Sequence, residues 1–404
     1  MLVAAQVLSG AGLAAGITVG ALLAQDMLGS TGLSGLPSAL FTIGSAAAAV
    51  FVGRLSQRWG RRAGLSLGYG AGAVGSLGVV AAAALGNVSL LFFALFVYGA
   101  GTAANLQARY AGADLAPEQH RGRAVSTVLM ATTLGAVAGP NLATITGDLA
   151  DALNIPQLAG PFLLAVVAYA AAGLVLWVML RPDPLLTARE FASGTPQETD
   201  SADLSAQHHP SGVAGGSGRL VLGASVMVLT QLVMVGIMTM TPIHMQHHGH
   251  GVGAAGVVIA VHVAGMYLPS PISGLLADRF GRLPVATAAA VTLLAAGLLA
   301  AFAPPHSVVL LALALGLLGL GWNFGLVSGT AIITDTVPLA TRAKTQGTVD
   351  VAIALSGAGG GMASGLVVAG SDYATLTILG GVLALAIIPA VAYTARTSPV
   401  VIAR

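Results

Sequence analysis

The sequence predicts an all-α membrane protein with twelve transmembrane helices in two six-helix halves. Three observations lead to this prediction: only 7% of the residues are charged, long apolar runs recur along the chain, and one pattern of loop residues occurs twice. Soluble domains carry about 25% charged residues. A chain with 56% hydrophobic residues therefore lacks the polar surface that water requires, whereas a lipid bilayer removes that requirement.

The apolar runs form two sets of six, and a run of roughly 20 residues is long enough to cross a bilayer as a helix. The first set covers about 1–25, 37–57, 63–85, 88–112, 123–147 and 157–180, and the second about 220–243, 252–276, 284–303, 306–333, 345–369 and 373–394. The run that begins at Met1 has no basic segment before it, so we expect a retained first span.

The segment 182–218 is rich in Ser, Gly, Pro and His and contains no apolar run, which is typical of a flexible linker. We therefore expect an N-terminal bundle at 1–181, a cytoplasmic linker at 182–218 and a C-terminal bundle at 219–404.

The positive charges predict the orientation. All 16 Lys and Arg residues fall on one side of the predicted membrane. Basic loops remain in the cytoplasm, so we expect both chain ends and the linker there, in a bacterial-type cytoplasmic (inner) membrane. The net charge of +2 gives no indication of a nucleic-acid partner, and a chain without cysteine has no disulfide or thiolate metal site.

The two halves repeat a set of residues at a constant offset of 221 positions. The identical pairs are Gly53/Gly274, Leu55/Leu276, Arg58/Arg279, Gly60/Gly281, Arg61/Arg282, Asp114/Asp335, Pro117/Pro338 and Arg121/Arg342. Many secondary transporters consist of duplicated halves with the substrate site near the middle of the membrane. The repeat therefore predicts a carrier that performs no covalent chemistry, and not an enzyme.

Two loops resemble the signature of the major facilitator superfamily. They read Gly53-Arg-Leu-Ser-Gln-Arg-Trp-Gly-Arg-Arg62 and Gly274-Leu-Leu-Ala-Asp-Arg-Phe-Gly-Arg282. In that superfamily the signature joins spans 2 and 3 and again spans 8 and 9, and its charges help to hold one conformation. The resemblance assigns this conformational role to Gly53, Arg58, Gly60, Arg61, Gly274, Asp278, Arg279, Gly281 and Arg282. Gln57 replaces the usual Asp, so we expect a weaker contact in the first loop.

Methionine and histidine are concentrated in the segment 227–266. It holds six of the 11 Met and five of the 9 His residues. Met234 and Met238 are four positions apart in one predicted span, and His262 and Met266 are four positions apart in the next. Pairs with this spacing share a helix face, and the two antiparallel spans place Met238 and His262 at similar depth.

Thioether sulfur is a soft, neutral ligand that favours Cu(I), and imidazole also binds copper. Met234, Met238, His262 and Met266 are therefore candidate ligands along a copper pathway. His244, Met245, His247, His248 and His250 form a candidate capture patch in the loop on the non-cytoplasmic side. Each residue also has a plainer interpretation, since methionine fills gaps in apolar cores and a loop histidine can simply be solvated.

The two spaced pairs, within the run from Met238-Thr-Met-Thr-Pro-Ile-His-Met245 to His262-Val-Ala-Gly-Met266, closely resemble copper importers of the CcoA type. These proteins supply copper for the assembly of cbb-type haem–copper oxidases. The resemblance implies copper as the transported substrate, no permanently bound cofactor, and a monomer in the lipid bilayer. Cytoplasmic copper chaperones are the protein partners that this role implies.

Two acidic residues are candidates for coupling transport to an ion. Asp26 lies at the outer end of span 1, and Asp350 lies within span 11. A buried carboxylate can take up a proton. The alternative for Asp350 is an ordinary helix-start residue near the cytoplasmic face.

Two other functions compete with copper uptake. Gly135-Ala-Val-Ala-Gly-Pro140 resembles a motif of antiporters, which favours a proton-coupled exporter of drugs or other small molecules; the same motif also serves as a packing element. Against an exporter, no Arg occurs between Ala100 and Asn105 of span 4, where the drug exporters usually carry one. The other alternative is a copper sensor or scaffold in the membrane that moves nothing.

Overall fold

The computed structural model describes residues 1–28, 36–194 and 211–397, and secondary structure within these ranges is helical throughout. The N-terminal half contains α1 (Leu2–Leu28), α2 (Leu36–Trp59), α3 (Arg61–Leu85), α4 (Val88–Ala113), α5 (Arg121–Asn141), α6 (Ala143–Ala152) and α7 (Gly160–Met179). The C-terminal half contains α9 (Ser211–His247), α10 (Val252–Tyr267), α11 (Ser270–Phe280), α12 (Arg282–Phe302), α13 (Val308–Thr336), α14 (Arg342–Gly370), α15 (Tyr373–Ala384) and α16 (Ile387–Thr397).

The described part of the chain holds 10 helices or helix pairs that are long and apolar enough to cross a membrane. The two remaining predicted spans are α1 and the pair α5–α6. Three predicted spans are interrupted: the helix breaks after Asn141, near Pro269 and at Leu385. The pattern of apolar residues does not predict these interruptions, because each half-helix stays apolar on both sides of the break. The twelve-helix architecture in two halves is confirmed.

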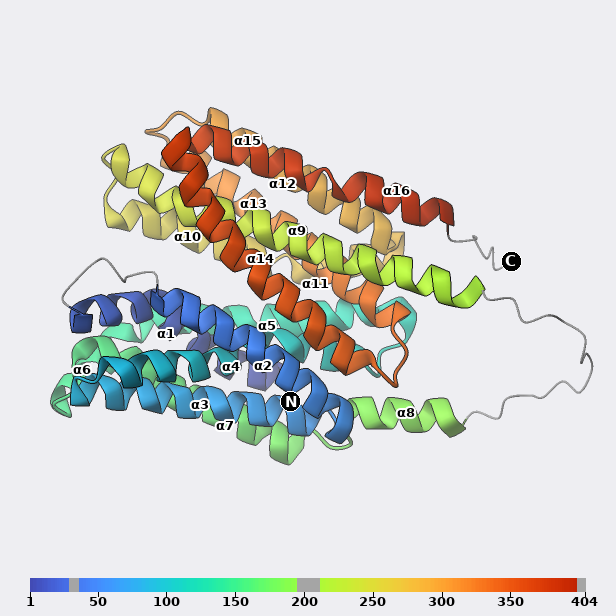
Figure 1. Ribbon diagram of the computed structural model, residues 1–404, viewed down its shortest axis with the longest axis horizontal. Coiled ribbons are helices and arrows are strands. Elements are labelled where there is room, and N and C mark those ends of the chain that lie inside the picture. The colour runs from blue at the N-terminus through green and yellow to red at the C-terminus, as the bar shows by residue number, and fades with distance from the viewer. Residues whose placement is uncertain (29–35, 195–210, 398–404) are drawn as a thin grey trace, which may run out of the picture.

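The two halves lie side by side, and α14 runs obliquely from one toward the other (Figure 1). The N-terminal half has its own apolar core, built around residues such as Tyr69, Tyr98, Phe162 and Tyr169. The larger apolar cluster of the C-terminal half, which includes Trp322, extends to Val125 and Leu129 of α5. We call the end of the bundle that carries α8 (Pro184–Gly194) the linker end, and the opposite end the far end.

The predicted flexible linker begins with an ordered helix. The Asp183 carboxylate accepts hydrogen bonds from the backbone N–H groups of Leu185 and Leu186, at the start of α8, at 3.0 and 3.2 Å. Its second oxygen accepts from the Arg62 N–H, at the start of α3, at 2.7 Å. One acidic side chain thus caps two helix starts, which anchors α8 to the N-terminal half. Residues 195–210 of the linker lie outside the described residues.

Gly60 and Gly281 occupy equivalent positions before α3 and α12, with φ of 91° and 94°. At their ψ of 167° and 163° this backbone region is essentially restricted to glycine. The turn that reverses the chain between the paired spans therefore depends on these two residues. Gly281 has no neighbour that a Cβ would strike, so only its backbone angles require glycine.

Gly281→Ala is expected to destabilise the protein by about 1–3 kcal/mol, the cost of a strained backbone conformation. Thermal unfolding of the purified protein in detergent measures the effect. Gly70→Ala is the matched control, because Gly70 lies inside helix α3 and a Cβ there would meet nothing within 4 Å. Equal melting temperatures for the two variants would contradict the assignment of strain to this turn.

Candidate functional site

The Asp278 carboxylate of the C-terminal half binds the start of helix α5 in the N-terminal half. The two carboxylate oxygens of Asp278, in α11, accept hydrogen bonds from the backbone N–H groups of Gly122 and Arg123 at 2.8 and 2.9 Å. These N–H groups belong to the first turn of α5, where they have no partner within the helix. The positive end of the helix dipole also attracts the negative carboxylate.

Gln57 forms the equivalent contact in the opposite direction. Its Oε1 accepts from the N–H groups of Ala343 and Lys344, at the start of α14, at 2.8 and 3.3 Å. Its Nε2 donates to the carbonyl oxygens of Leu339 and Ala340 at 3.1 and 2.7 Å. At the offset of 221, Gln57 corresponds to Asp278, and Ala343 and Lys344 correspond to Gly122 and Arg123. The amide thus keeps the geometry of the missing Asp and replaces its charge with two donated bonds.

Two glycines allow the halves to approach closely beside these contacts. A Cβ on Gly53 would lie 2.8 Å from the Ala343 carbonyl oxygen and 3.0 Å from the Gly347 Cα. A Cβ on Gly274 would collide with the Gly122 backbone and the Ser126 hydroxyl. We call the Gln57 and Asp278 contacts, with these glycines, the linker-end gate.

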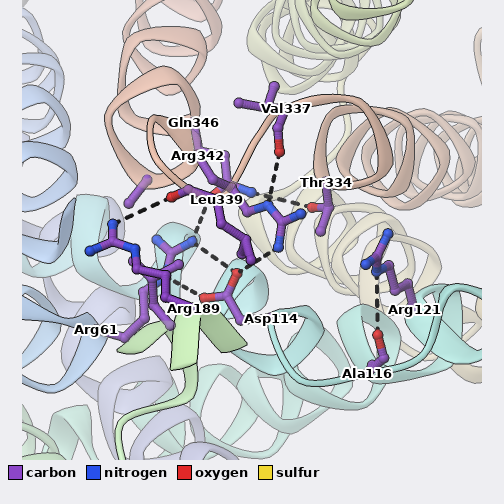
Figure 2. A network of polar contacts seen from close by, with 12 residues as sticks. Arg61, Asp114, Ala116, Arg121, Arg189, Thr334, Val337, Leu339, Arg342 and Gln346 are labelled. Carbon is purple, nitrogen blue, oxygen red and sulfur yellow. Dashed lines mark hydrogen bonds and ion pairs between the residues drawn. The ribbon is translucent and has the colours of Figure 1, made fainter. Parts of the chain in front are cut away.

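Ion pairs surround the gate, and four of them also obey the repeat. Within each half, Arg61 pairs with Asp114 at 2.7 Å and Arg282 with Asp335 at 3.0 Å. Across the halves, Arg121 pairs with Asp335 at 2.6 Å and Arg342 with Asp114 at 3.8 Å. Figure 2 shows Asp114 between Arg61 and Arg342, with Arg189 of α8 reaching the Leu339 carbonyl. Each carboxylate therefore binds one arginine from each half.

Arg58 and Arg279 lie outside this network. Both are exposed, and each guanidinium lies over the ring of the next residue, Trp59 or Phe280, at 5.6 and 5.5 Å. Their place in the repeated loop is consistent with a role on the membrane surface and not with a bond across the halves.

A buried ion pair joins the halves deeper in the protein. Arg109 of α4 donates to Asp350 Oδ1 of α14 at 2.7 Å, and the two side chains are 0% and 2% exposed. Tyr110 also donates to Asp350 Oδ1, at 3.2 Å. Arg109 Nε donates to the Thr330 hydroxyl of α13 at 3.0 Å. Asp350 therefore lies inside the interface between the halves and is not an exposed helix-start residue.

The sequence groups Arg109 with Arg121 and Arg123 on the basic side of the membrane, near the end of the predicted span at about 88–112. The structure places it inside α4, four residues before Ala113, where the helix ends. The repeat itself distinguishes Arg109 from the repeated arginines, because position 330 carries Thr where position 109 carries Arg. Asp26, the other candidate for coupling, is exposed near the end of α1.

The two spaced pairs of candidate copper ligands lie against the same helix, α13. The His262 ring binds the Leu315 carbonyl at 2.9 Å, and the Met266 carbonyl accepts from Asn323 at 2.7 Å. From α9, the Gln231 side-chain oxygen accepts a hydrogen bond from the indole N–H of Trp322, on α13, at 2.7 Å. Trp322 also packs edge-on against Tyr267 of α10, with ring centroids 5.8 Å apart. Trp322 thus contacts Gln231, three positions before Met234, and Tyr267, the residue after Met266.

The depths of the pairs agree with the sequence prediction. Gln231 and the Met266 carbonyl bind adjacent residues of α13, so they lie at the same level. Met234 follows Gln231 by three positions, roughly 4.5 Å along α9, and Met238 follows by one further turn, toward the level of His262. Met234 is buried, and Met238 and Met266 are half-buried against the same apolar cluster.

His262 has the hydrogen bonding of a metal-ligating histidine. Because Nδ1 faces a carbonyl oxygen, Nδ1 carries the hydrogen and Nε2 carries the lone pair. Nε2 is buried and makes no hydrogen bond within the described residues. Histidine ligands typically donate their second N–H to a carbonyl or carboxylate, which fixes the ring. A free lone pair on a fixed, buried imidazole can accept a metal ion or a proton.

The histidine-rich loop at the far end is only partly organised. His244 stacks on Tyr373 with ring centroids 4.3 Å apart, and His248 Nδ1 binds the His244 carbonyl at 2.8 Å. His250 Nε2 binds the Pro305 carbonyl at 2.8 Å. Met245 is buried in the core, so its side chain does not belong to an exposed patch. Among the described residues, no group of three or more His, Cys, Asp or Glu side chains is arranged to hold a metal ion.

The antiporter-like run in α5 acts as a packing element in this structure. A Cβ on Gly135 would collide with the Val7 carbonyl oxygen and approach the Ala11 nitrogen. A Cβ on Gly10 would collide with the Thr132 carbonyl oxygen. The two glycines allow α1 and α5 to pack closely.

Gln57→Ala removes four hydrogen bonds across the gate, and each contributes about 0.5–1.5 kcal/mol. A Ser126→Cys reporter, buried beneath the gate of this cysteine-free chain, is expected to react with a maleimide about tenfold faster in that background. Arg54→Ala, an exposed neighbour on α2, serves as the control and leaves the rate unchanged. Equal rates for all three proteins would show that Gln57 does not hold the gate.

Known proteins match the whole chain. The model of the Major Facilitator Superfamily matches residues 1–249 and 223–402. The chain is 57% identical over 388 residues to the uncharacterized MFS-type transporter YdeG of Bacillus subtilis (96% of this chain, 89% of YdeG). It is 32% identical over 337 residues to the riboflavin transporter RfnT of Brucella anthropi (83% of this chain, 79% of RfnT).

Solved structures agree on the fold. The proton:xylose symporter XylE superposes with a TM-score of 0.74 at 16% identity, covering 98% of this chain and 94% of XylE. The human organic anion transporter MFSD10 superposes with a TM-score of 0.75 at 14% identity, covering 96% of this chain and 97% of MFSD10. The repeated gate, the two six-helix halves and the match along the full sequence lead to one conclusion: the chain belongs to the major facilitator superfamily of membrane transporters.

Proposed function

We propose that the protein carries copper across the cytoplasmic membrane by alternating access. The single observation that supports this most is His262, whose ring is fixed by the Leu315 carbonyl while its Nε2 lone pair has no partner. A buried polar atom without a partner is costly unless a function retains it. A bound metal ion would use that lone pair.

The other candidate ligands have the softness that Cu(I) prefers. Met234, Met238 and Met266 carry neutral thioethers and pack in or against the apolar cluster that contains Trp322. A set of thioethers and one imidazole holds copper without a thiolate, so the ion can be released again. The exposed His247 and His248, with His244 beside Tyr373, would bind copper transiently at the far end before it enters.

The positive charges suggest the direction in which the protein faces. If the basic linker end lies in the cytoplasm, the closed gate places this structure in the state that excludes the cytoplasm. Copper would then enter from the far end, pass His262 and the methionines, and leave when the gate opens. Its destination would be cytoplasmic chaperones and the assembly of cbb-type cytochrome oxidase, as the CcoA resemblance implies.

A flavin is the second candidate cargo, and a different observation favours it. The relative RfnT is a riboflavin transporter, and the 32% identity extends over most of both chains. A flavin would bind through ring stacking and hydrogen bonds, for which Trp322, Tyr267 and Gln231 are suitable. The two candidates therefore share one region of the protein and differ in the side chains that they require.

Cells that lack their own copper importer are expected to accumulate radioactive copper when they express this protein, and to lose at least about nine-tenths of that uptake with His262→Ala. Met234→Leu, which keeps the volume and removes the sulfur, is expected to have a similar effect. Met227→Leu is the matched control, because Met227 packs its sulfur against Gly329 of α13 as part of the core. Isotope counting at equal expression measures the difference.

The same cells distinguish the alternatives. Copper uptake that survives His262→Ala would contradict the proposed site. No copper uptake, together with uptake of radioactive riboflavin that needs Trp322, would identify a flavin carrier instead. Copper bound to the purified protein without accumulation in cells would identify a sensor or scaffold, and copper lost from cells faster than in the empty host would identify an exporter.

A further inference from the structure

The Arg109–Asp350 pair differs from the gate in depth. Asp350 lies eight positions after Arg342, where α14 begins, which is roughly 12 Å along the helix axis. Both side chains are buried, and the halves that carry them must separate here when the linker end opens. Opening of the linker end would therefore break this pair.

The pair occurs once, whereas the gate occurs twice. At the offset of 221, Arg109 corresponds to Thr330 and Asp350 to Leu129. Arg109 even binds its own counterpart, since its Nε donates to the Thr330 hydroxyl at 3.0 Å. A duplicated frame needs each gate contact in both halves. Because the Arg109–Asp350 pair has no counterpart at the repeat offset, we expect its role to differ from that of the gate.

Separation of the halves would affect the hydrogen bonds of Arg109 and Asp350 differently. Arg109 also donates to the Leu106 carbonyl and the Tyr110 hydroxyl, both on its own helix, and keeps these bonds. Among the described residues, Asp350 accepts only from Arg109 and Tyr110, which both belong to the opposite half. Its second oxygen, Oδ2, is buried without any hydrogen bond in the described structure. Separation therefore leaves a buried carboxylate with no partner.

A charge without a partner in an apolar interior is strongly unfavourable, and a proton removes it. The carboxylates in and around the gate do not face this problem. Asp278 keeps Arg282 of its own half, at 3.9 Å. Asp114 keeps Arg61 and Asp335 keeps Arg282, each from its own half. Asp350 is thus the carboxylate of this interface whose charge depends most directly on the two halves being together.

We propose that Asp350 is the proton-coupling site of this transporter. A hydronium ion transfers its proton to Oδ2, an O–H bond forms, and a water molecule is released. The neutral acid no longer attracts Arg109, and the linker end opens. The proton then returns to water on the linker side, and the carboxylate binds Arg109 again as the gate closes. With that end in the cytoplasm, the protein is an inward proton symporter.

The groups that surround Asp350 are compatible with this role. From α4 they are Arg109 and Tyr110, from α13 Thr330, from α3 Arg61, and from α10 Tyr267 near Arg109. The side chains of α9 that lie beside α14 are neutral: Gln231 and Val235 beside Gly357, and Thr239 beside Gly361. Arginine stays protonated and tyrosine stays neutral at physiological pH, so within this set the carboxylate is the group left to exchange a proton.

The test measures the gate directly and needs no cargo. The chain contains no cysteine, so Gln119→Cys in the N-terminal half and Lys344→Cys in the C-terminal half carry the only two spin labels. Both positions are exposed at the linker end. Distances between the labels are measured by pulsed electron paramagnetic resonance in nanodiscs, from about pH 5 to pH 8. As the pH falls, the ratio of open to closed protein is expected to rise by up to tenfold per pH unit, the limit for one proton.

Asp350→Asn is expected to abolish this pH dependence, because the amide imitates the protonated acid and cannot titrate. Asp114→Asn is the matched control: it loosens the gate but keeps the pH dependence. If Asp350→Asn does not fold, Arg109→Gln decides the matter, since it leaves the carboxylate and shifts the midpoint of opening to higher pH. A pH dependence that persists in Asp350→Asn, or is absent from the parent protein, would overturn the proposal.

A second measurement separates coupling from cargo. Proteoliposomes with an alkaline interior are given Cu(I) outside, and both copper entry and internal acidification are followed. The parent protein is expected to bring in copper with protons, whereas Asp350→Asn exchanges copper without accumulating it. Copper entry with no acidification would overturn the coupling role alone. No copper entry, with the pH-dependent gate intact, would overturn the copper proposal alone.

Discussion

The state seen here depends on side-chain oxygens that bind the first N–H groups of a helix in the opposite half. A helix start offers N–H groups that have no partner within the helix, and both Asp278 and Gln57 use them. The glycines beside these contacts allow the backbones to approach, and the arginines around Asp114 and Asp335 fix the geometry. Because these bonds are few and lie at one end, two rigid halves can separate there without unfolding.

The helices and the gate contacts repeat in the two halves, whereas the residues proposed to bind copper and protons do not. The gate, the strained glycines and the ion pairs recur at one offset. The residues proposed to handle copper and protons do not: His262 corresponds to Phe41, Met234 to Leu13 and Asp350 to Leu129. On this account duplication supplies the movement, and the residues proposed in one half would supply the binding. This arrangement explains why the fold is shared with carriers of quite different substrates, whereas the cargo depends on a few side chains.

The sequence predicts the helices and the paired gate contacts well, because both follow directly from the composition and the repeated loops. Apolar runs mark the helices, and the offset marks the paired contacts. The rest depends on three-dimensional packing. The breaks in α5–α6, α10–α11 and α15–α16 lie within apolar runs. The ordered α8 depends on Asp183, and Gln57 was expected to weaken a contact that it in fact makes with four bonds. Arg109 was counted only among the charges of one membrane side, because charge alone does not reveal a partner on α14.

The candidate copper site combines prediction and structure. The spacing of Met and His residues predicts the ligand types and their depth, and the structure adds the carbonyl that fixes the His262 ring. The most direct test is X-ray absorption at the copper edge on the purified protein loaded with one Cu(I). The account predicts sulfur neighbours together with an imidazole nitrogen, and loss of the nitrogen signal in His262→Ala. A copper shell of oxygen and nitrogen only, unchanged in that variant, would contradict it.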